Sequence, residues 1–444
     1  MMCYKAQCYR PTDKAAVFVQ PGEAEISLHP DGDLGSSSLL DADFQDRLLH
    51  DGRQELRVRF DIQTSDVLFD LTRLFVRRRA ALPTGIDRIE MAFAQQLLEE
   101  DGINTHFVLK VGSGALVLHA SYARDLIESM AALWRETSSE GGSYRLFLRK
   151  RPIQDVIFDF LTDSLRPVKK IWAREPVGEL RAALDKGEIT YLTTGHNGLA
   201  RTPGLLSKVV GKASLPIRAY IHDLIPIQYP EFQRAGVGQA LATYLLELAQ
   251  NQSQFVANSH ATAEELKSWL TAQGHNNVVR ASYPPLQHVL GPTARHDVAE
   301  PPSFMVVGSV EPRKNHLLLL NVWRQMVEEK TTPMPHLIIA GHSGWLNNET
   351  RQVIEESSLI RPFLSVYSEM SDSELFEKMT TVRALLFPSF AEGLGIPLLE
   401  AQMLGTPCIA SDIPVFREIS GPSVRLLDPI DGRAWRTAIE EMSK

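Results

Sequence analysis

The chain has 444 residues, 44% of them hydrophobic and 23% charged, which excludes a small disulfide-stapled protein and leaves room for two or three domains. The formal net charge of −8 argues against a general nucleic-acid binder, because binding to the phosphate backbone needs a cationic surface. The three cysteines, Cys3, Cys8 and Cys408, lack metal-ligand spacing and are odd in number, which favours a reducing compartment, the cytoplasm by default.

The N-terminus lacks the apolar segment of a signal peptide. No run elsewhere approaches the 18 or so apolar residues that a membrane span needs. Residues 1–60 are rich in Asp, Ser, Gly and Pro and are predicted to form a flexible or irregular extension. Its D-x-D runs, at residues 31–33 and 41–43, follow no predicted strand and are interpreted as solvated acids.

Residues 61–290 are predicted to form a first α/β domain. The apolar run at 66–75 indicates a buried strand. The stretch 84–100 has apolar residues at helical spacing, and Thr84 is placed to cap that helix. Further strands are expected at 190–194, 217–221 and 254–257, and polar residues follow each of them.

Prolines and polar residues between 283 and 303 indicate a linker. Residues 303–444 then alternate between strand and helix patterns, which is typical of a parallel sheet with helices on both faces. The predicted architecture is two Rossmann-like, doubly wound domains that face each other across a cleft. Ligands of such sheets bind at the carboxyl ends of the strands.

Two cations, Arg313 and Lys314, follow the strand that ends at Gly308, in the loop that opens the next helix. Because the helix dipole is positive at this end, neighbouring cations are unfavourable unless an anion is present. A phosphate would satisfy both cations and the free N–H groups of the helix. The alternative is a pair of solvated basic residues.

The stretch FAEGLGIPLLEAQMLGTP, residues 390–407, places two glutamates around a predicted helix start. Glu392 lies in a loop whose Gly393 and Gly395 remove side chains where a ligand would approach the backbone. Glu400 lies close to the first helical turn, which Pro397 begins. The alternative is that Glu400 merely complements the helix dipole.

The run from Glu392 to Pro414 closely resembles the E-x7-E motif of family 4 glycosyltransferases, the retaining GT-B group. VGSVEPRKN, residues 307–315, resembles the phosphate-binding segment of that family. TGIDRIE, YIHDLIP and VANSHATAEEL extend the resemblance over most of residues 66–444. Relatives often return a last helix to the first domain, whereas this chain stops soon after WRTAIEEM, so domain closure is expected to differ.

The resemblance implies a role for each matching residue. Glu392 would bind hydroxyls of the donor sugar, and Glu400 would hold the ribose of the nucleotide. Arg313 and Lys314 would neutralise the diphosphate as charge develops on the leaving group. Some relatives carry a further arginine where Ser309 follows Gly308. The backbone of Gly393, Leu394 and Gly395 would line the sugar.

In the first domain, the resemblance places Gly85 at a turn whose backbone approaches the donor phosphate. It places His196 near the donor sugar and the acceptor. With Glu392, Arg313 and Lys314, His196 would then be one of the catalytic residues. His222 and Asp223 would lie in the same vicinity. Ordinary structural roles for the turn glycine and for both histidines stay open.

No side chain is a convincing nucleophile, which fits a front-face reaction in which the donor phosphate helps to take the acceptor proton. A carboxylate pair of the glycosidase kind is the competing interpretation. No metal or other cofactor is expected, because Arg313 and Lys314 can supply the charge of a divalent ion.

Residues 144–174 mix basic and aromatic side chains, and Arg77, Arg78 and Arg79 lie in the same half. This composition suits docking on an anionic membrane surface, and a solvated helical face suits it equally. Peripheral contact with the inner face of the cytoplasmic membrane would imply a lipid-linked saccharide acceptor.

The sequence thus predicts a retaining glycosyltransferase that uses a nucleotide-sugar donor and a saccharide acceptor in glycan or surface polysaccharide biosynthesis. GDP-mannose is the expected donor, with dTDP-rhamnose and UDP-sugars as alternatives. A catalytically silent scaffold of the same fold is a rival, against which the intact motifs argue. A dinucleotide-dependent oxidoreductase is disfavoured, because Gly236 and Gly238 follow a proline-containing loop instead of a strand.

Overall fold

The computed structural model describes residues 55–78, 80, 83–111, 114–135, 174–196, 198–201, 204–206, 215–285, 300–344 and 348–444. All of these lie within one compact unit, Leu39–Lys444. Most of the predicted extension, most of the linker after residue 283, and the basic segment 144–174 except for its last residue lie outside the described residues.

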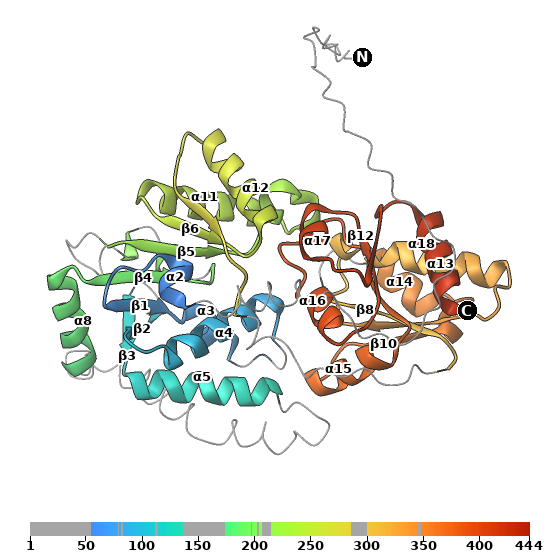
Figure 1. Ribbon diagram of the computed structural model, residues 1–444, viewed down its shortest axis with the longest axis horizontal. Helices are drawn as coiled ribbons and strands as arrows, with labels where there is room; N and C mark the ends of the chain where they lie inside the picture. Colours follow the sequence, from blue (N-terminus) through green and yellow to red (C-terminus); the bar gives the residue numbers. More distant parts are fainter. Residues whose placement is uncertain are drawn as a thin grey trace, which may run out of the picture. The chain divides into compact units, whose positions relative to one another are not determined.

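Among the described residues, the first sheet holds seven strands in the order β3-β2-β1-β4-β5-β6-β7. Figure 1 shows β3 to β6 side by side in this order. All its neighbouring strands pair in parallel except β2 and β3, which are antiparallel. Every residue of β4 and β5 is buried, as expected for parallel strands covered on both faces. The strands are β1 (Asp66–Asp70), β2 (Asn104–Val111), β3 (Gly114–Leu118), β4 (Ile189–Thr193), β5 (Ile217–Ile221), β6 (Gln254–Ala257) and β7 (Val279–Ala281).

Helices of the first half cover this sheet, and the helix that starts at Gly85 begins with a capping box. Thr84 accepts a hydrogen bond from the backbone of Asp87, whose carboxylate binds the Thr84 amide in return. The predicted Thr84 cap is therefore confirmed. The helices are α2 (Leu56–Phe60), α3 (Thr72–Arg77), α4 (Gly85–Glu99), α5 (Ala120–Arg135), α8 (Arg174–Lys186), α10 (Ile225–Gln228), α11 (Val237–Gln250) and α12 (His260–Ala272), with short 3-10 turns at Leu199–Arg201 and Pro230–Phe232.

The second sheet is parallel in all its pairings and has the order β10-β9-β8-β11-β12-β13. This order, which grows outward in both directions from β8, is that of a doubly wound dinucleotide-type sheet, as predicted. Its strands are β8 (Ser303–Val307), β9 (His336–Ala340), β10 (Leu364–Tyr367), β11 (Ala384–Phe387), β12 (Cys408–Ser411) and β13 (Val424–Leu427).

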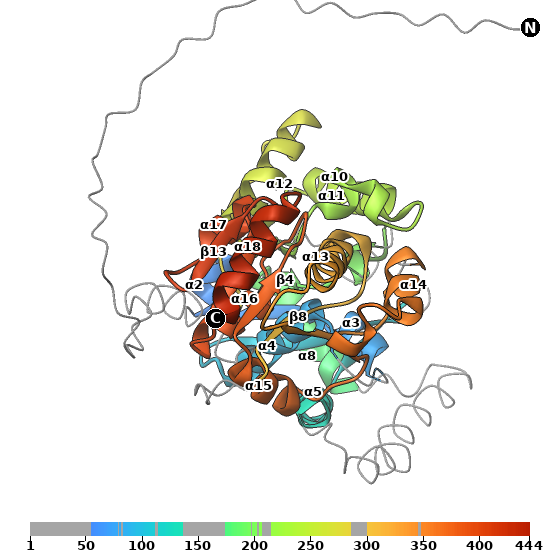
Figure 2. The same ribbon diagram turned by 90° about the vertical axis from the view of Figure 1, so that its right-hand side faces the viewer.

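The helices of the second half pack on both faces of that sheet, and Figure 2 shows α13 and α18 side by side. Trp323 of α13 and Trp435 of α18 are fully buried in the core that they share with β8, β9 and β11. The helices are α13 (His316–Glu328), α14 (Asn348–Glu356), α15 (Asp372–Thr381), α16 (Ile396–Met403), α17 (Pro414–Ile419) and α18 (Gly432–Ser443), with 3-10 turns at Pro312–Lys314 and Arg361–Phe363.

Two expectations for the first half need correction. The strand predicted over 66–75 ends at Asp70, and α3 begins at Thr72. The carboxylate of Asp70 accepts hydrogen bonds from the amide and hydroxyl of Thr72 and turns the chain there. The end of the predicted extension is also ordered, because α2 buries Leu56 and Phe60 completely or almost so.

Contacts at the start of α12 join the two halves of the protein. The carbonyl of Gly393 accepts hydrogen bonds from the hydroxyls of Ser259 (2.8 Å) and Thr262 (3.1 Å). The carboxylate of Glu418 accepts hydrogen bonds from the amides of His260 (2.7 Å) and Ala261 (2.8 Å), the first residues of α12. The two sheets are therefore held together through backbone as well as side-chain groups.

Candidate active site between the two sheets

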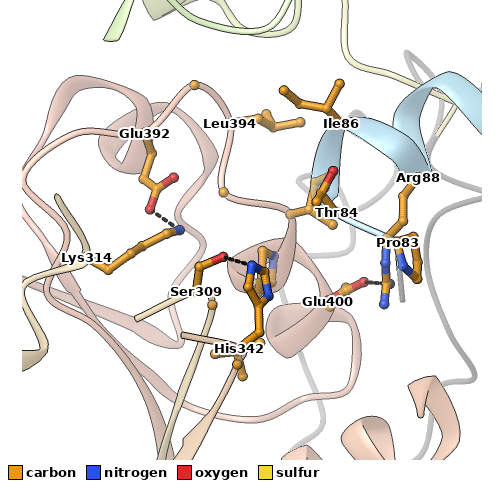
Figure 3. Close-up of a pocket in the computed structure, with 18 of the residues that line it drawn as sticks. Pro83, Thr84, Ile86, Arg88, Ser309, Lys314, His342, Glu392, Leu394 and Glu400 are labelled. Atoms are coloured by element: carbon orange, nitrogen blue, oxygen red, sulfur yellow. Dashed lines mark hydrogen bonds and ion pairs between the residues drawn. The ribbon is translucent and has the colours of Figure 1, made fainter. Parts of the chain in front are cut away.

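A cavity of about 520 Å³ is lined by residues of both halves. Its walls are the loops that follow β5, β6, β8, β9, β10 and β11, together with the first turn of α4. These loops all leave the carboxyl ends of parallel strands, where ligands of such sheets bind. Figure 3 shows two separate carboxylates in it, Glu392 beside Lys314 and Glu400 beside Arg88.

Glu392 is held by the two cations that the sequence singled out. Its Oε2 lies 2.7 Å from Nη1 of Arg313, and its Oε1 lies 2.5 Å from Nζ of Lys314. Burial raises the pKa of Glu392, but the charges of Arg313 and Lys314 outweigh burial and lower it to about 2. Glu392 is therefore ionised, and it supplies the anion that the two cations at this loop require.

Arg313 is fixed more firmly than a solvated loop arginine would be. Its Nη1 also donates to the carbonyl of Ala391 (2.7 Å), and its Nη2 donates to the carboxylate of Glu311 (2.6 Å). Its own carbonyl accepts a hydrogen bond from the amide of Phe390 (2.9 Å). These bonds tie the loop after β8 to the loop after β11, so Arg313 and Glu392 have defined positions.

Two glycines of the loop after β11 are required, one because another part of the backbone approaches it closely and one because its φ is positive. A Cβ at Gly393 would overlap the carbonyl oxygen of His222, which belongs to the first half. Gly395 has φ of +89° at the position that caps α16, a conformation that favours glycine. Gly393, Leu394 and Gly395 all line the cavity, and Leu394 is almost completely buried.

Glu400 lies in α16 and is only 3% exposed, yet it faces the cavity. Nη1 of Arg88 donates to its Oε1 at 3.0 Å, and the other amino group of Arg88 pairs with Asp372. Burial raises the pKa of Glu400, Arg88 lowers it and Asp372 raises it, with a net value of about 7. The carboxylate predicted to hold ribose is therefore close to its titration point at neutral pH.

Three further predicted residues of the first half line the same cavity: Gly85, His222 and Asp223. Nε2 of His222 lies 2.7 Å from the carbonyl oxygen of Thr194, so Nε2 carries the proton and donates it to this bond. Burial lowers the pKa of His222 to about 4, which makes the ring neutral at physiological pH. Burial also raises the pKa of Asp223, and Arg313 acts in the opposite direction.

His196 does not line the cavity, although the sequence placed it among the catalytic residues. Its ring lies 5.5 Å from the ring of His222 and 5.9 Å from that of Tyr244. Burial lowers the pKa of His196 well below its usual range. The structure therefore places His196 next to His222, a residue that lines the cavity.

Sequence reasoning missed Arg73 and Arg88, the two arginines of the first half that line the cavity. Arg73 lies 2.8 Å from Asp87 and 3.6 Å from Glu90, a fully buried carboxyl whose pKa burial raises well above its usual range. Arg88 lies in the first turn of α4. The helix-dipole argument that singled out Arg313 and Lys314 applies equally to Arg88.

The expectations about a metal ion and about contact with a membrane can be compared with the described parts of the chain. Among the described residues, no group of three or more His, Cys, Asp or Glu side chains could hold a metal ion. Within those same ranges, no helix is both long enough and apolar enough to cross a bilayer. Arg77 pairs with Asp87 and Arg78 stacks on Phe75, so these two arginines are engaged within the protein, while Arg79 lies outside the described ranges.

The chain is similar to known transferases over part of its length. Residues 294–444 match the family described as Glycosyl transferases group 1. The serotype-specific mannosyltransferase WbdA of Escherichia coli is 30% identical over 216 residues, 45% of this chain and 26% of that protein. The O-antigen chain mannosyltransferase RfbU of Salmonella typhimurium is 30% identical over 144 residues, 32% of this chain and 38% of that protein. The matches thus span about a quarter to two fifths of these relatives.

The same fold occurs in HepE of Anabaena, whose crystal structure was solved in complex with UDP-glucose. The two chains superpose with a TM-score of 0.52 at 14% sequence identity, over 85% of this chain and 89% of that one. A likeness at this level of identity establishes the fold. The predicted architecture is confirmed: the chain has the GT-B fold, and its residues 294–444 match the glycosyl transferases group 1 family.

Proposed function

We propose that this protein transfers a sugar from a nucleotide sugar to a saccharide acceptor. The observation that carries the proposal is one cavity with two buried carboxylates, Glu392 and Glu400, each bound to at least one cation. A nucleotide sugar presents matching groups, since its two sets of hydroxyls suit carboxylates and its diphosphate suits cations.

In the proposed complex the nucleotide lies across the start of α16. Glu400 accepts hydrogen bonds from the ribose hydroxyls, and Glu392 accepts them from the donor sugar. Arg313 and Lys314 leave Glu392 for the diphosphate and stabilise the charge that develops as the bond to the sugar breaks. Gly85, at the first position of α4, brings backbone N–H groups towards the same phosphates.

The reaction proceeds with retention and without a protein nucleophile or a metal ion in this proposal. His222 and Asp223 lie near the reacting sugar, and the neutral ring of His222 is held by its bond to Thr194. Arg313 and Lys314 provide the charge that a divalent ion supplies in other transferases. Activity is therefore expected to survive treatment with a chelator.

The donor is proposed to be GDP-mannose and the acceptor a lipid-linked saccharide of surface polysaccharide assembly at the inner face of the cytoplasmic membrane. The names of the similar proteins support this choice, since WbdA and RfbU are described as mannosyltransferases and RfbU also as an O-antigen enzyme. Donors based on dTDP-rhamnose or UDP are the alternatives.

Calorimetry with GDP, UDP and dTDP, followed by hydrolysis assays with the corresponding nucleotide sugars, tests this proposal. One nucleoside diphosphate should bind clearly more tightly than the others, and its sugar derivative should be hydrolysed slowly without acceptor. A folded protein that binds none of the three would refute the proposed function. Binding without hydrolysis or transfer would favour a silent scaffold.

A further inference from the structure

Arg88 connects the two halves of the protein inside the cavity. It lies in the first turn of α4, and its guanidinium bridges Glu400 of α16 and Asp372 of α15. The Arg88 side chain is 17% exposed, while that of Glu400 is 3% exposed. The bridge is therefore largely shielded from solvent. In such a shielded position an ion pair affects the protonation of its members more than it does at a protein surface.

The bridge leaves part of Glu400 unused. Only Oε1 receives the Arg88 hydrogen bond, and among the described residues no hydrogen bond to Oε2 is found. Glu400 lines the cavity, as do Gly85, Ile396 and Pro397. Glu400 can therefore accept a further hydroxyl while Arg88 stays in place.

The charges around Glu400 oppose one another. Arg88, from α4, favours the ionised carboxylate, whereas Asp372, from the start of α15, and burial favour the neutral carboxyl. Because these influences place the pKa near 7, loss of Arg88 would leave a buried carboxyl beside a like charge. Such a carboxyl is protonated at neutral pH and is a weaker acceptor of hydroxyl hydrogen bonds.

We propose that Arg88 is a positioning residue of the nucleotide site, which holds Glu400 ionised and oriented so that its free oxygen binds the ribose hydroxyls. This inference rests on the proposed function, since it takes Glu400 as the ribose-binding carboxylate. Asp372 has the complementary role of orienting Arg88 while limiting the ionisation of Glu400. A purely structural bridge would hold the halves together without any preference for ribose.

The test compares two ligands and two variants. The ligands are the nucleoside diphosphate that binds the wild-type protein best and its 2′,3′-dideoxy form, titrated by calorimetry from about pH 5.5 to pH 9. The variants are Arg88→Gln and Asp372→Asn. Arg425→Gln is the matched control, because Arg425 forms an exposed ion pair with Glu441 away from the cavity.

Below about pH 7, wild-type affinity should fall more steeply for the ribose form than for the dideoxy form, because titration of the diphosphate is common to both ligands. Arg88→Gln should weaken binding of the ribose form about tenfold at pH 7, because a charge-assisted hydrogen bond is lost. Raising the pH should restore that binding, and the dideoxy form should respond little. In Asp372→Asn, the pH below which affinity for the ribose form falls should be lower than in the wild-type protein.

An equal loss for both ligands in Arg88→Gln, with the pH limit unchanged, would overturn the inference and leave a structural bridge. If Arg88→Gln does not fold, the test relies on Asp372→Asn. The inference would then be overturned if that variant loses affinity for the ribose form at the same pH as the wild-type protein. Failure of the wild-type protein to bind any nucleoside diphosphate would instead refute the proposed function. The two failures are therefore distinguishable.

Discussion

Glu392 binds the same two cations that the proposed reaction assigns to the diphosphate. In the structure Arg313 and Lys314 lie 2.7 and 2.5 Å from its carboxylate oxygens. A diphosphate must therefore compete with a carboxylate that is already in place. Because of this competition, substitution of Glu392 and substitution of Glu400 should affect nucleotide binding differently, although both are buried acids of one motif.

Replacing each glutamate by alanine should separate the two roles. Glu392→Ala removes the competitor of the diphosphate, so nucleoside diphosphate affinity should stay the same or increase while sugar transfer falls by about a hundredfold or more. Glu400→Ala should weaken nucleotide binding about tenfold, since ribose loses its acceptor. Calorimetry and transfer assays on both variants measure these effects, and an equal loss of affinity in both would contradict the division of roles.

Arg313→Ala should destabilise the protein as well as abolish transfer. Arg313 is 15% exposed and pairs with Glu311 and Glu392, which are 3% and 10% exposed. Removal of one partner from such a buried network leaves uncompensated carboxylates and costs about 3 to 5 kcal/mol. Urea unfolding should show this loss, with Arg425→Gln as an exposed control. A stability equal to that of the control would mean that the carboxylates take up protons at little cost.

At the scale of elements, the loop between β11 and α16 fits against the first half so closely that position 393 has no room for a side chain. Gly393→Ala would push a methyl group into the carbonyl of His222 and disturb the hydrogen bonds from Ser259 and Thr262 to Gly393. We expect a lower melting temperature and a large loss of transfer in this variant.

Gly85→Ala is the matched comparison, because it alters a glycine of the first half that lines the same cavity. A Cβ there would lie 3.7 Å from Ile396, an ordinary contact, and its φ lies outside the left-handed region that favours glycine. The melting temperature should therefore be kept, while nucleoside diphosphate affinity falls if the phosphates approach this backbone. Equal destabilisation by both substitutions would show that the close approach at Gly393 is not the cause.

At the scale of the whole molecule, Glu418 of α17 links the two halves through the start of α12. Its carboxylate accepts hydrogen bonds from two free amides of that helix and from the hydroxyl of Tyr283 (2.9 Å). A carboxylate at a helix N-terminus also interacts favourably with the helix dipole. The link therefore combines a cap with a contact between domains.

Glu418→Gln should weaken this link by about 1 to 2 kcal/mol, because the charge is lost and an amide cannot accept hydrogen bonds with both of its ends. Urea unfolding followed by fluorescence should show a lower midpoint and a less cooperative transition. Glu441→Gln, at an exposed ion pair within the second half, serves as the control. Identical unfolding curves for the two variants would show that Glu418 adds nothing to the coupling of the halves.

Much of this architecture could be predicted from local patterns. The alternation of strands and helices after residue 303, the Thr84 cap and the start of α16 near Pro397 depend on neighbouring residues, and the structure agrees with each. The strand predicted over 66–75 was wrong in its second half because apolar periodicity does not report a turn such as that at Asp70.

The partners of the site residues could not be predicted in this way. Arg88 and Glu400 are separated by 312 positions in the chain, and the pairing depends on how the two sheets are brought together. For the same reason the position of His196 behind His222, outside the cavity lining, was not foreseen. Residue types near strand ends identified the cavity, whereas the ion pairs within it required the three-dimensional structure.

The ion pairs of Glu392 also have a consequence for the end of each catalytic cycle under the proposed reaction. Once the sugar has been transferred, the spent nucleoside diphosphate is held by Arg313 and Lys314. Glu392 remains attached to the same loop and close to both, so its effective concentration is not reduced by dilution. Its return to the two cations would help to expel the product, and the carboxylate that binds the sugar would thereby also prepare the site for the next turnover.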